Sequence, residues 1–420
     1  MSRPRSLSKV LLYSHDTYGL GHLRRNLVIA RQLIGQGIRV VLASGSPVLD
    51  RVAQPEGLIS VQLPPVVKTG PDEYRSLGTD ISLSLVSRAR SAVLADIIAR
   101  WQPDVFLVDH AAQGMKGELL PVFDTIGDSS PGTKIVLGLR DILDEPALVR
   151  ATWANHGVYE TLNDVYDRIV VYGDRDVFDL VAGYGIPEPL ASSIEYCGYV
   201  TGHRPGHSIR PPGLSDGVGY VLGTVGGGGD GVDVLIATAH AARSAGLQAV
   251  LCSGPLMGGS DRRFLAEATD RMGGVVVVEH LQDVAAVAAG AECVVTRGGY
   301  NSLCELVNLA VPTVVVPRVW PRREQLLRAR AFAGRGLVRL VEASRAGESG
   351  EDGRQGGSCE GLDSSVARAV ADAINSAGGP RADLDLGGAQ RVVASLVRAL
   401  DTTNAPRLTT SQTLTSRIPA

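Results

Sequence analysis

Short apolar runs alternate with amphipathic segments along most of this chain. In the first half, the segment after residue 82 has helical spacing of apolar positions, as in Leu83, Val86, Val93, Leu94 and Ile97. The apolar runs that predict strands there are Lys9 to Ser14, Val40 to Leu42, Val105 to Val108, Ile135 to Leu139 and Ile169 to Tyr172. Strands that alternate with helices predict an α/β fold with a parallel sheet and right-handed crossovers.

The same alternation restarts in the second half. The apolar runs there are Gly219 to Leu222, Ala249 to Cys252, Val275 to Val278, Cys293 to Val295 and Thr313 to Val316. A stretch rich in Pro and Gly, His203 to Pro212, separates the two halves and is typical of a linker. Because 420 residues also suit two domains, we expect one domain at residues 1–205 and another at 206–401.

Two segments lack this alternation. Residues 342–361 are dense in Gly, Ser and charged side chains, which predicts a flexible insertion in the second domain. Residues 402–420 are rich in Thr and Ser and have no periodicity, which predicts a disordered tail. We expect neither segment to carry chemistry, although such a tail can dock a partner.

The segment Thr296 to Glu305 is the most informative motif of the chain. It joins an apolar strand to a predicted helix through Gly298 and Gly299, and a helix N-terminus after a glycine turn binds anions through its backbone N–H groups and its dipole. Arg297 adds positive charge, and Asn301 and Ser302 add donors. Glu305 cannot assist a phosphate, but its carboxylate can accept from both hydroxyls of a ribose. The segment therefore predicts a nucleotide pocket, with an ordinary capped βα unit as the alternative.

This segment resembles the donor-binding box of the GT-B glycosyltransferases, in particular the UDP-glycosyltransferases and the MurG-like GlcNAc transferases. The plant box reads T-H-C-G-W-N-S-x-x-E, and here the sequence is T-R-G-G-Y-N-S-L-C-E. The later plant motif W-P-x-x-x-[DE]-Q is matched, one residue shorter, by Trp320 to Gln325. The resemblance implies two Rossmann-like domains that face each other across a cleft, the first binding the acceptor and the second the nucleotide sugar.

The same resemblance implies roles for residues of the donor site. Asn301 and Ser302 would hold phosphate oxygens beside Gly299, with Arg297 in the place of the box's phosphate-binding histidine. Glu305 would bind the ribose. In the later motif, Glu324 and Gln325 would hold hydroxyls of the donor sugar.

A second glycine loop, Gly223 to Gly231, follows the first strand of the second domain. It contains G-x-G-x-x-G, but the carboxylate that a dinucleotide site wants after the next strand is missing, so we do not expect NAD. We expect Gly226 and Gly227 to close over the diphosphate. The plant motif W-x-P-Q, whose Trp stacks on uracil, is replaced by residues 279–282, and Leu281 takes the place of an apolar residue whose backbone binds the base in the MurG-like branch. We expect uracil, with GDP- and dTDP-sugars left open.

In the first domain, the turn Tyr18-Gly19-Leu20-Gly21-His22 follows the first strand and opens a helix. The helix dipole there opposes imidazolium formation, so His22 should be a neutral, base-competent imidazole. In the plant branch, the histidine of the corresponding turn is the general base and an acidic residue at the end of a later strand orients it, which implies Asp109 as the partner. His110 is an alternative base, and His15 is a candidate for lining the acceptor site.

Other polar residues near this turn allow more than one interpretation. The pair Arg140-Asp141 follows a strand, and its side chains either contact the acceptor or lie on the surface. Arg24, Arg25 and Arg31 either meet an anionic or lipid-linked acceptor or form a solvated helix face.

Composition narrows the function. A net charge of -3 and a pI near 6.3 argue against a nucleic-acid binder. The apolar run after the basic N-terminus is too short for a signal peptide, and no stretch approaches the ~18 apolar residues of a membrane span. The five cysteines show no metal spacing, so we expect free thiols and a cytoplasmic protein with at most peripheral membrane contact.

We expect neither a metal nor a cofactor. The D-x-D sequences at residues 174–176 and 383–385 are interpreted as solvated loop carboxylates. Helix dipoles and donors such as Arg297 would neutralise the leaving diphosphate.

The sequence thus predicts a glycosyltransferase that moves a hexose or N-acetylhexosamine from a UDP-linked donor to an acceptor hydroxyl, inverting and metal-independent. The alternatives are a nucleotide-sugar 2-epimerase of the same fold and a non-catalytic nucleotide-sugar-binding protein. The acceptor stays open.

Overall fold

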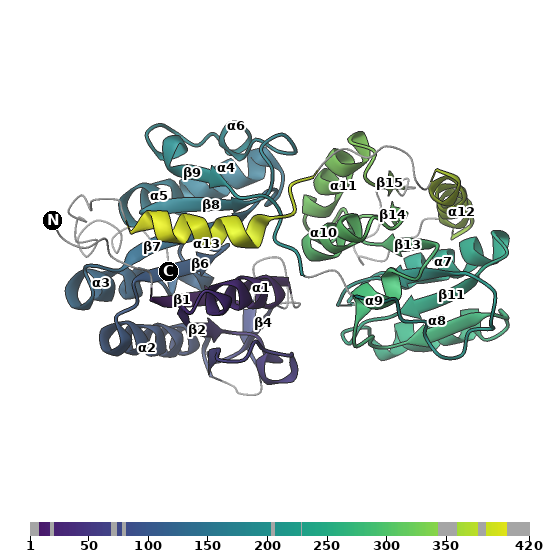
Figure 1. Ribbon diagram of the computed structural model, residues 1–420, viewed down its shortest axis with the longest axis horizontal. Helices are drawn as coiled ribbons and strands as arrows, with labels where there is room; N and C mark the ends of the chain where they lie inside the picture. The colour runs from purple at the N-terminus through teal and green to yellow at the C-terminus, as the bar shows by residue number, and fades with distance from the viewer. Residues whose placement is uncertain are drawn as a thin grey trace. The chain divides into compact units, whose positions relative to one another are not determined.

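The computed structural model describes residues 8–16, 21–68, 74–77, 81–202, 206–227, 229–342, 359–376 and 384–400. Contacts divide the chain into two compact units (Figure 1). The first unit comprises Met1–Thr201 with Leu384–Ala420, and the second comprises Gly202–Asp383. Each unit has a parallel β-sheet and flanking helices, which confirms the predicted α/β class.

The first unit is built on a sheet with the strand order β3-β2-β1-β6-β7-β8-β9, in which all neighbours are parallel. The strands are β1 (Lys9–Ser14), β2 (Arg39–Ser44), β3 (Ile59–Gln62), β6 (Val105–Asp109), β7 (Lys134–Arg140), β8 (Arg168–Tyr172) and β9 (Ile194–Tyr196). Strand β6 is buried along its whole length, as expected for a parallel sheet covered on both faces. The short strands β4 (Val66–Lys68) and β5 (Tyr74–Ser76) form a separate antiparallel pair.

Helices cover this sheet and place the catalytic candidates. They are α1 (Gly21–Gly35), α2 (Leu83–Trp101), α3 (Leu120–Ser129), α4 (Pro146–Asn155), α5 (Val158–Val165), α6 (Leu180–Tyr184) and α13 (Gly388–Ala399), with 3-10 turns η1 (Leu49–Arg51), η2 (Met115–Gly117) and η3 (Leu190–Ser193). The core lies between the sheet and these helices, and contains buried side chains such as Leu11, Phe106 and Leu137.

Helix α13 corrects the predicted domain boundary. We expected residues 206–401 to form one domain, but the chain returns to the first unit, where α13 packs against α1 and β8 (Figure 1). Its apolar face is fully buried, and Ser395 Oγ donates a hydrogen bond to Glu195 Oε2 at 2.7 Å. A local pattern shows that such a helix has an apolar face but does not show which distant surface covers that face.

The second unit has a sheet with the strand order β12-β11-β10-β13-β14-β15, again parallel throughout. The strands are β10 (Tyr220–Thr224), β11 (Gln248–Cys252), β12 (Val275–Val278), β13 (Cys293–Thr296), β14 (Thr313–Val315) and β15 (Arg339–Leu340). The helices are α7 (Val232–Ser244), α8 (Gly259–Thr269), α9 (Val284–Ala288), α10 (Tyr300–Leu309), α11 (Glu324–Gly334) and α12 (Cys359–Asn375).

The two sheets share one topological feature that positions both candidate sites. In each, the strand order reverses beside the first strand, between β1 and β6 and between β10 and β13. Ligands of such sheets bind outside the carboxyl ends of the strands at this switch point. The paired residues at these ends are Ser14 with Asp109 in one unit and Thr224 with Thr296 in the other. The motifs predicted from the sequence therefore begin at the two switch points.

Some predicted features lie outside the described residues. These are residues 343–358 of the expected insertion, the tail 402–420, the turn residues 17–20 and Gly228. Among the helices that the structure describes, none combines the length and the apolar character needed to cross a bilayer.

Candidate functional site

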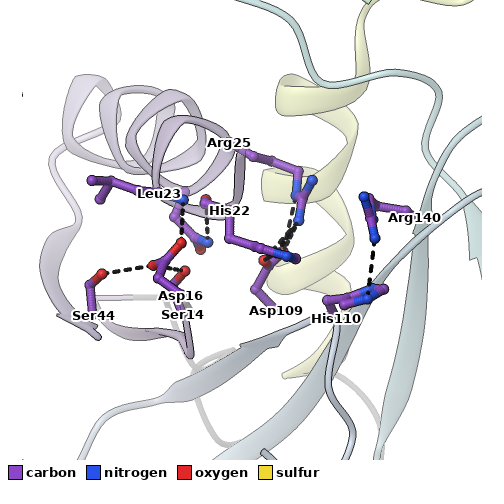
Figure 2. Close-up of polar contacts among 10 residues, drawn as sticks. Ser14, Asp16, His22, Leu23, Arg25, Ser44, Asp109, His110 and Arg140 are labelled. Atoms are coloured by element: carbon purple, nitrogen blue, oxygen red, sulfur yellow. Dashed lines mark hydrogen bonds and ion pairs between the residues drawn. The ribbon is translucent and has the colours of Figure 1, made fainter. Parts of the chain in front are cut away.

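Asp16 fixes the place where α1 begins in the first unit. Its carboxylate is buried and accepts hydrogen bonds from Ser14 Oγ at 2.5 Å, Ser44 Oγ at 2.8 Å and the backbone N–H of Leu23 at 3.2 Å. These contacts tie the first turn of α1 to the ends of β1 and β2 (Figure 2). His22, the second residue of that helix, is thereby held at the switch point.

His22 and Asp109 form the contact that the sequence predicted. His22 Nδ1 lies 2.6 Å from Asp109 Oδ2 (Figure 2). Because an ionised carboxylate only accepts, this contact is a hydrogen bond in the tautomer with a proton on Nδ1; Arg25 Nη2, 2.9 Å from the same nitrogen, can only donate and makes no hydrogen bond to it in that tautomer. The other ring nitrogen of a neutral His22, Nε2, then keeps its lone pair and can take a proton from a substrate.

Arg25 is the third member of this group, and it follows His22 by three residues on α1. Its Nε and Nη2 lie 3.0 and 2.9 Å from Asp109 Oδ1, and Nη2 is also 2.8 Å from Oδ2. The guanidinium lies over the ring of Tyr172, with Cζ 4.9 Å from the ring centroid. Because the side chain is only 1% exposed, neither predicted role of Arg25, acceptor contact or solvated face, is correct.

The charges around Asp109 favour its ionised form. Burial alone would raise the pKa of this carboxyl, but the neighbouring Arg25 guanidinium and His22 ring outweigh burial and hold the pKa below its ordinary value. Asp109 therefore stays a carboxylate at neutral pH and can keep accepting from His22.

Two further imidazoles flank His22. Its ring centroid lies 4.8 Å from that of His15 and 5.1 Å from that of His110. Burial, which penalises the charged form, lowers the pKa of both flanking histidines well below its ordinary value; His22 adds to this for His15, and Arg140 does so for His110. Arg140 Nη2 is also 3.3 Å from His110 Nε2 (Figure 2). The flanking rings are thus neutral polar groups at neutral pH.

Asp141 does not take part in this group. It is fully buried, and it accepts from the backbone N–H of Ile142 at 2.7 Å and from Tyr199 Oη at 2.9 Å. Of the predicted Arg140-Asp141 pair, only Arg140 lies beside the imidazoles.

In the second unit, the turn before α10 leaves open space at the helix N-terminus. Gly298 has φ +81°, and a Cβ there would lie 2.6 Å from Val315 Cγ1. Gly299 caps the helix, and a Cβ there would meet nothing within 4 Å. Asn301, Ser302 and Glu305 lie half-buried in the following turns. The geometry suits an anion held by first-turn N–H groups, with Glu305 one turn behind.

Two arginines stand beside this turn, and each is paired with an aspartate of the segment that follows β10. Arg297 Nη2 donates to Asp233 Oδ1 at 3.0 Å, and Arg318 Nη1 lies 3.8 Å from Asp230 Oδ1. In both arginines Nε is buried and has no hydrogen-bond partner within the described parts of the chain. Arg297 thus lies where the sequence placed it, while Arg318 was not predicted.

The glycine loop after β10 comes close to the loop after β11. Gly226 has φ +66°, and Gly227 accepts a hydrogen bond from the backbone N–H of Leu256 at 2.8 Å. A Cβ on Gly254 would lie 2.6 Å from the backbone of Gly226 and Gly227. This close approach explains why small residues occupy both loops.

The remaining predicted donor residues have structural contacts of their own. Leu281 packs against the small core cluster under β10 and β11. Gln325 Oε1 accepts from the backbone N–H of Arg318 at 3.1 Å, and Glu324 lies 3.9 Å from Arg328 on the next turn of α11. Gln325 therefore fixes the loop that carries Arg318.

Within the described residues, no group of three or more His, Cys, Asp or Glu side chains is arranged to hold a metal ion. Asp174 accepts from the backbone N–H of Asp176 at 2.9 Å, and Asp385 is ion-paired with Arg391. Asp383 lies outside the described residues.

Comparison with known proteins adds a match over part of the chain and a fold shared with solved structures. Residues 239–349 match the glycosyltransferase family 28 C-terminal domain. The fold is similar to that of MurG from Acinetobacter baumannii (14% identity, TM-score 0.53, covering 93% of this chain and 99% of that one). It is also similar to a UDP-glucosyltransferase from Polygonum tinctorium (13%, 0.57, 95% and 100%).

The chain has the GT-B fold of glycosyltransferases, and its second unit contains the family 28 segment.

This glycosyltransferase also shares its fold with a Listeria monocytogenes protein assigned as a UDP-N-acetylglucosamine 2-epimerase (14%, TM-score 0.62, covering 96% of this chain and 99% of that one). No curated protein sequence matches the chain. The family match and the shared fold support transfer of a glycosyl group from a nucleotide sugar. The matched family 28 segment includes the turn before α10.

The glycosyltransferase contains one group of candidate residues in each unit. The first consists of His22 and Asp109 with Arg25, His15 and His110. The second consists of Arg297, Gly299, Asn301, Ser302 and Glu305, with Gly226 and Gly227 on the neighbouring loop. Asp16 and Arg318 were missed: Asp16 follows β1 by two residues and Arg318 follows β14, so their positions after predicted strands were the available signal.

Proposed function

We propose that the enzyme transfers a hexose or N-acetylhexosamine from a UDP-linked donor to an acceptor hydroxyl, with inversion and without a metal ion. The observation that carries the proposal is the 2.6 Å contact between His22 Nδ1 and Asp109 Oδ2. A hydroxyl is a poor nucleophile, and a positioned base is worth ~10²–10⁴-fold in rate. The contact prepares His22 for that task.

In the proposed reaction, Nε2 of His22 takes the proton of the acceptor O–H. The acceptor oxygen forms a bond to the anomeric carbon while the bond from that carbon to the diphosphate oxygen breaks. The nucleoside diphosphate leaves with the bonding electrons, and attack from the face opposite to it inverts the anomeric centre. Asp109 stabilises the imidazolium that forms and holds its orientation.

His22 is a better candidate base than its neighbours. The pKa of His110 is lowered well below its usual value by burial and then by Arg140, and the pKa of His15 is lowered by burial and then by His22. A lowered pKa makes each a weaker base, and only His22 contacts a carboxylate. The flanking imidazoles would instead donate hydrogen bonds to, or accept them from, hydroxyls of the acceptor.

The donor would bind at the N-terminus of α10. Its first-turn N–H groups, Arg297 and the side chains of Asn301 and Ser302 would receive the diphosphate, and Glu305 would receive the ribose hydroxyls. Arg318 extends the positive charge on this side of the loop. Fixed donors and helix dipoles of this kind stabilise the charge that develops on a leaving diphosphate. The fold shared with a UDP-glucosyltransferase favours uracil as the base.

The test compares two histidines of the first unit. His22→Ala should lower the turnover of a UDP-sugar by ~10²–10⁴-fold while UDP binds with unchanged affinity. Turnover is followed as UDP released from UDP-glucose and UDP-GlcNAc with a panel of sugar, phenol and lipid-linked alcohols, and UDP affinity is measured by calorimetry. The exposed His156 is the matched control, and His156→Ala should behave as the wild type. Wild-type turnover in His22→Ala would remove His22 from the mechanism.

A 2-epimerase is the second candidate, and the fold shared with the Listeria monocytogenes protein favours keeping it in the test. UDP-GlcNAc incubated alone with the enzyme should remain unchanged when followed by NMR. Appearance of the 2-epimer would replace the transferase proposal. Binding of UDP-sugars without turnover of any kind would indicate a binding protein instead.

A further inference from the structure

The guanidinium of Arg25 occupies an unusual position beneath the candidate base. It contacts both oxygens of Asp109 at 2.8 to 3.0 Å, and its Nη2 is 2.9 Å from His22 Nδ1. The side chains of Arg25 and Asp109 are 1% and 0% exposed. A buried ion pair is a poor route to stability, because removing two charges from water offsets most of their attraction. The Arg90–Glu118 pair is just as enclosed, so what points to a functional role for Arg25 is its contact with His22.

We propose that Arg25 is a positioning residue that acts through Asp109: it locks the carboxylate toward His22 and balances its negative charge, so that His22 stays a neutral base. The proposal rests on the role of His22 as general base. It extends that role, because the base would then depend on three residues in contact: His22, Asp109 and Arg25.

The locking part follows from the hydrogen bonds. Arg25 Nε and Nη2 both bind Oδ1 of Asp109, while Oδ2 lies 2.6 Å from His22 Nδ1. Nη2 also lies 2.8 Å from Oδ2, so the planar guanidinium contacts both carboxylate oxygens and prevents the carboxylate from rotating away from the imidazole. The ring of Tyr172 supports the guanidinium, with the ring centroid 4.9 Å from Arg25 Cζ.

Residue 138 makes this support possible. A Cβ at Gly138 on β7 would lie 1.8 Å from Tyr172 Oη, so only glycine leaves room for the tyrosine ring. A continuous set of contacts thus runs from Gly138 through Tyr172, Arg25 and Asp109 to His22. Three strands and one helix contribute to it.

The charge-balancing part follows from the distances. A carboxylate at 2.6 Å from Nδ1 favours the doubly protonated imidazolium, which cannot act as a base. A guanidinium nitrogen 2.9 Å from the same Nδ1 disfavours it. The other groups facing His22 are His15 from the end of β1 and His110 after β6, with Arg140 from β7 behind His110. None of these supplies a second negative charge.

The experiment titrates His22 directly. Histidine labelled with ¹³C in the ring is incorporated into the whole chain, and the His22 signal is assigned among the eight histidines by its loss in His22→Ala. Arg25→Gln keeps hydrogen-bond donors but removes the charge, and should move the midpoint of the His22 titration to higher pH by about 1. Arg25→Lys keeps the charge and should move it by much less. Arg31→Gln, at an exposed position of the same helix, should not move it.

The pH dependence of kcat/KM provides the second measurement. The acidic limb of this profile should shift to higher pH by the same amount in Arg25→Gln. At pH values below the wild-type limb, kcat/KM of Arg25→Gln should therefore be about tenfold lower than that of the wild type. An unchanged His22 midpoint in a folded Arg25→Gln protein would overturn the proposal and leave Arg25 a structural ion pair.

A second pair of variants covers the case in which Arg25→Gln does not fold. Asp109→Asn and Asp109→Asn with Arg25→Gln contain no unbalanced carboxylate, and loss of the guanidinium should again raise the midpoint by about 1. Equal midpoints in these two proteins would overturn the charge-balancing role. The titration does not depend on turnover, so it separates this proposal from the proposed function. If His22→Ala had wild-type turnover, His22 would not be the base. A shifted midpoint in Arg25→Gln would then still show that Arg25 balances the charge of Asp109.

Discussion

The two switch points of this enzyme have the same strand order but are lined by different kinds of groups. In the first unit, the space beside β1 and β6 holds ionisable side chains, with His22, Asp109 and Arg25 in direct contact. In the second, the space beside β10 and β13 is formed by glycines and a helix N-terminus. Proton transfer requires side chains with defined charge, whereas a diphosphate is held well by backbone N–H groups that glycine leaves accessible. In the proposed function, one topology would serve both needs, with only the loops differing between the two units.

The ion pairs beside the two switch points differ in the same sense. Arg25 with Asp109 and Arg90 with Glu118 are fully enclosed, and Arg90 also donates to the backbone oxygen of His15 at 3.0 Å. The pair of Arg297 with Asp233 is more open, because the aspartate side chain is 39% exposed. Enclosed pairs hold the first unit in one geometry, while more open pairs can exchange partners with an incoming anion.

The largest effect that tests this comparison is expected at Glu305. Its carboxylate stands one turn behind the glycine turn, and Glu305→Ala should weaken UDP binding by ~1.5–3 kcal/mol, because a charge-assisted contact to the ribose is lost. Calorimetry with UDP measures the change. Glu267→Ala, which removes an exposed carboxylate from α8, should bind UDP as the wild type does. Unaltered affinity in Glu305→Ala would mean that the ribose is held elsewhere.

Much of this arrangement could be predicted from the sequence. The central strands of both sheets were found because long apolar runs mark buried parallel strands, and the candidate residues were sought just after such strands because ligands of these sheets bind there. His22 and Asp109 were predicted on these grounds and from the resemblance, and they are in contact. Edge strand β3 was missed because it is only half-buried and has no apolar run.

Arg25 shows where the pattern stops being informative. Among Arg24, Arg25 and Arg31, periodicity could not identify the one that turns inward, because the burial of Arg25 depends on a carboxylate that is far from it in the sequence. That carboxylate is 84 residues away, at the end of β6. The return of α13 to the first unit was hidden for the same reason, since it depends on contacts across nearly 200 residues.

The next prediction separates glycines that the fold needs from glycines that the ligand needs. Gly298→Ala places a Cβ at φ +81° and against Val315, and should cost ~1–3 kcal/mol of unfolding free energy. A Cβ at Gly299 meets nothing within 4 Å, so Gly299→Ala should cost only the preference for Gly over Ala at an N-cap, about 1 kcal/mol or less. Its methyl group would narrow the space in front of the first-turn N–H groups of α10 and weaken UDP binding by roughly tenfold. Thermal denaturation and calorimetry measure the two effects. If Gly299→Ala bound UDP normally, the donor would not approach this helix end.

The last prediction concerns the response of the two switch points to acid. Burial lowers the pKa of His15 and His110 well below the ordinary value of 6.5. As the pH falls below about 6.5, the unfolded chain takes up protons at these positions and the folded chain does not. The first unit should therefore lose up to about 1.4 kcal/mol of stability per pH unit for each of the two histidines. The lowered pKa of Asp109 acts in the same direction, but only below its ordinary value of 3.8.

Hydrogen exchange measured peptide by peptide between pH 6.5 and 5.5, corrected for the intrinsic exchange rate, locates this loss. Peptides of β1 and β6 should lose protection faster than those of β10 and β13, whose switch point is lined by glycines. His110→Gln should reduce the difference by about half, because one of the two linked protonations is removed. Equal loss of protection in both units would show that acid acts through groups elsewhere, and that the enclosed imidazoles do not set the first unit apart.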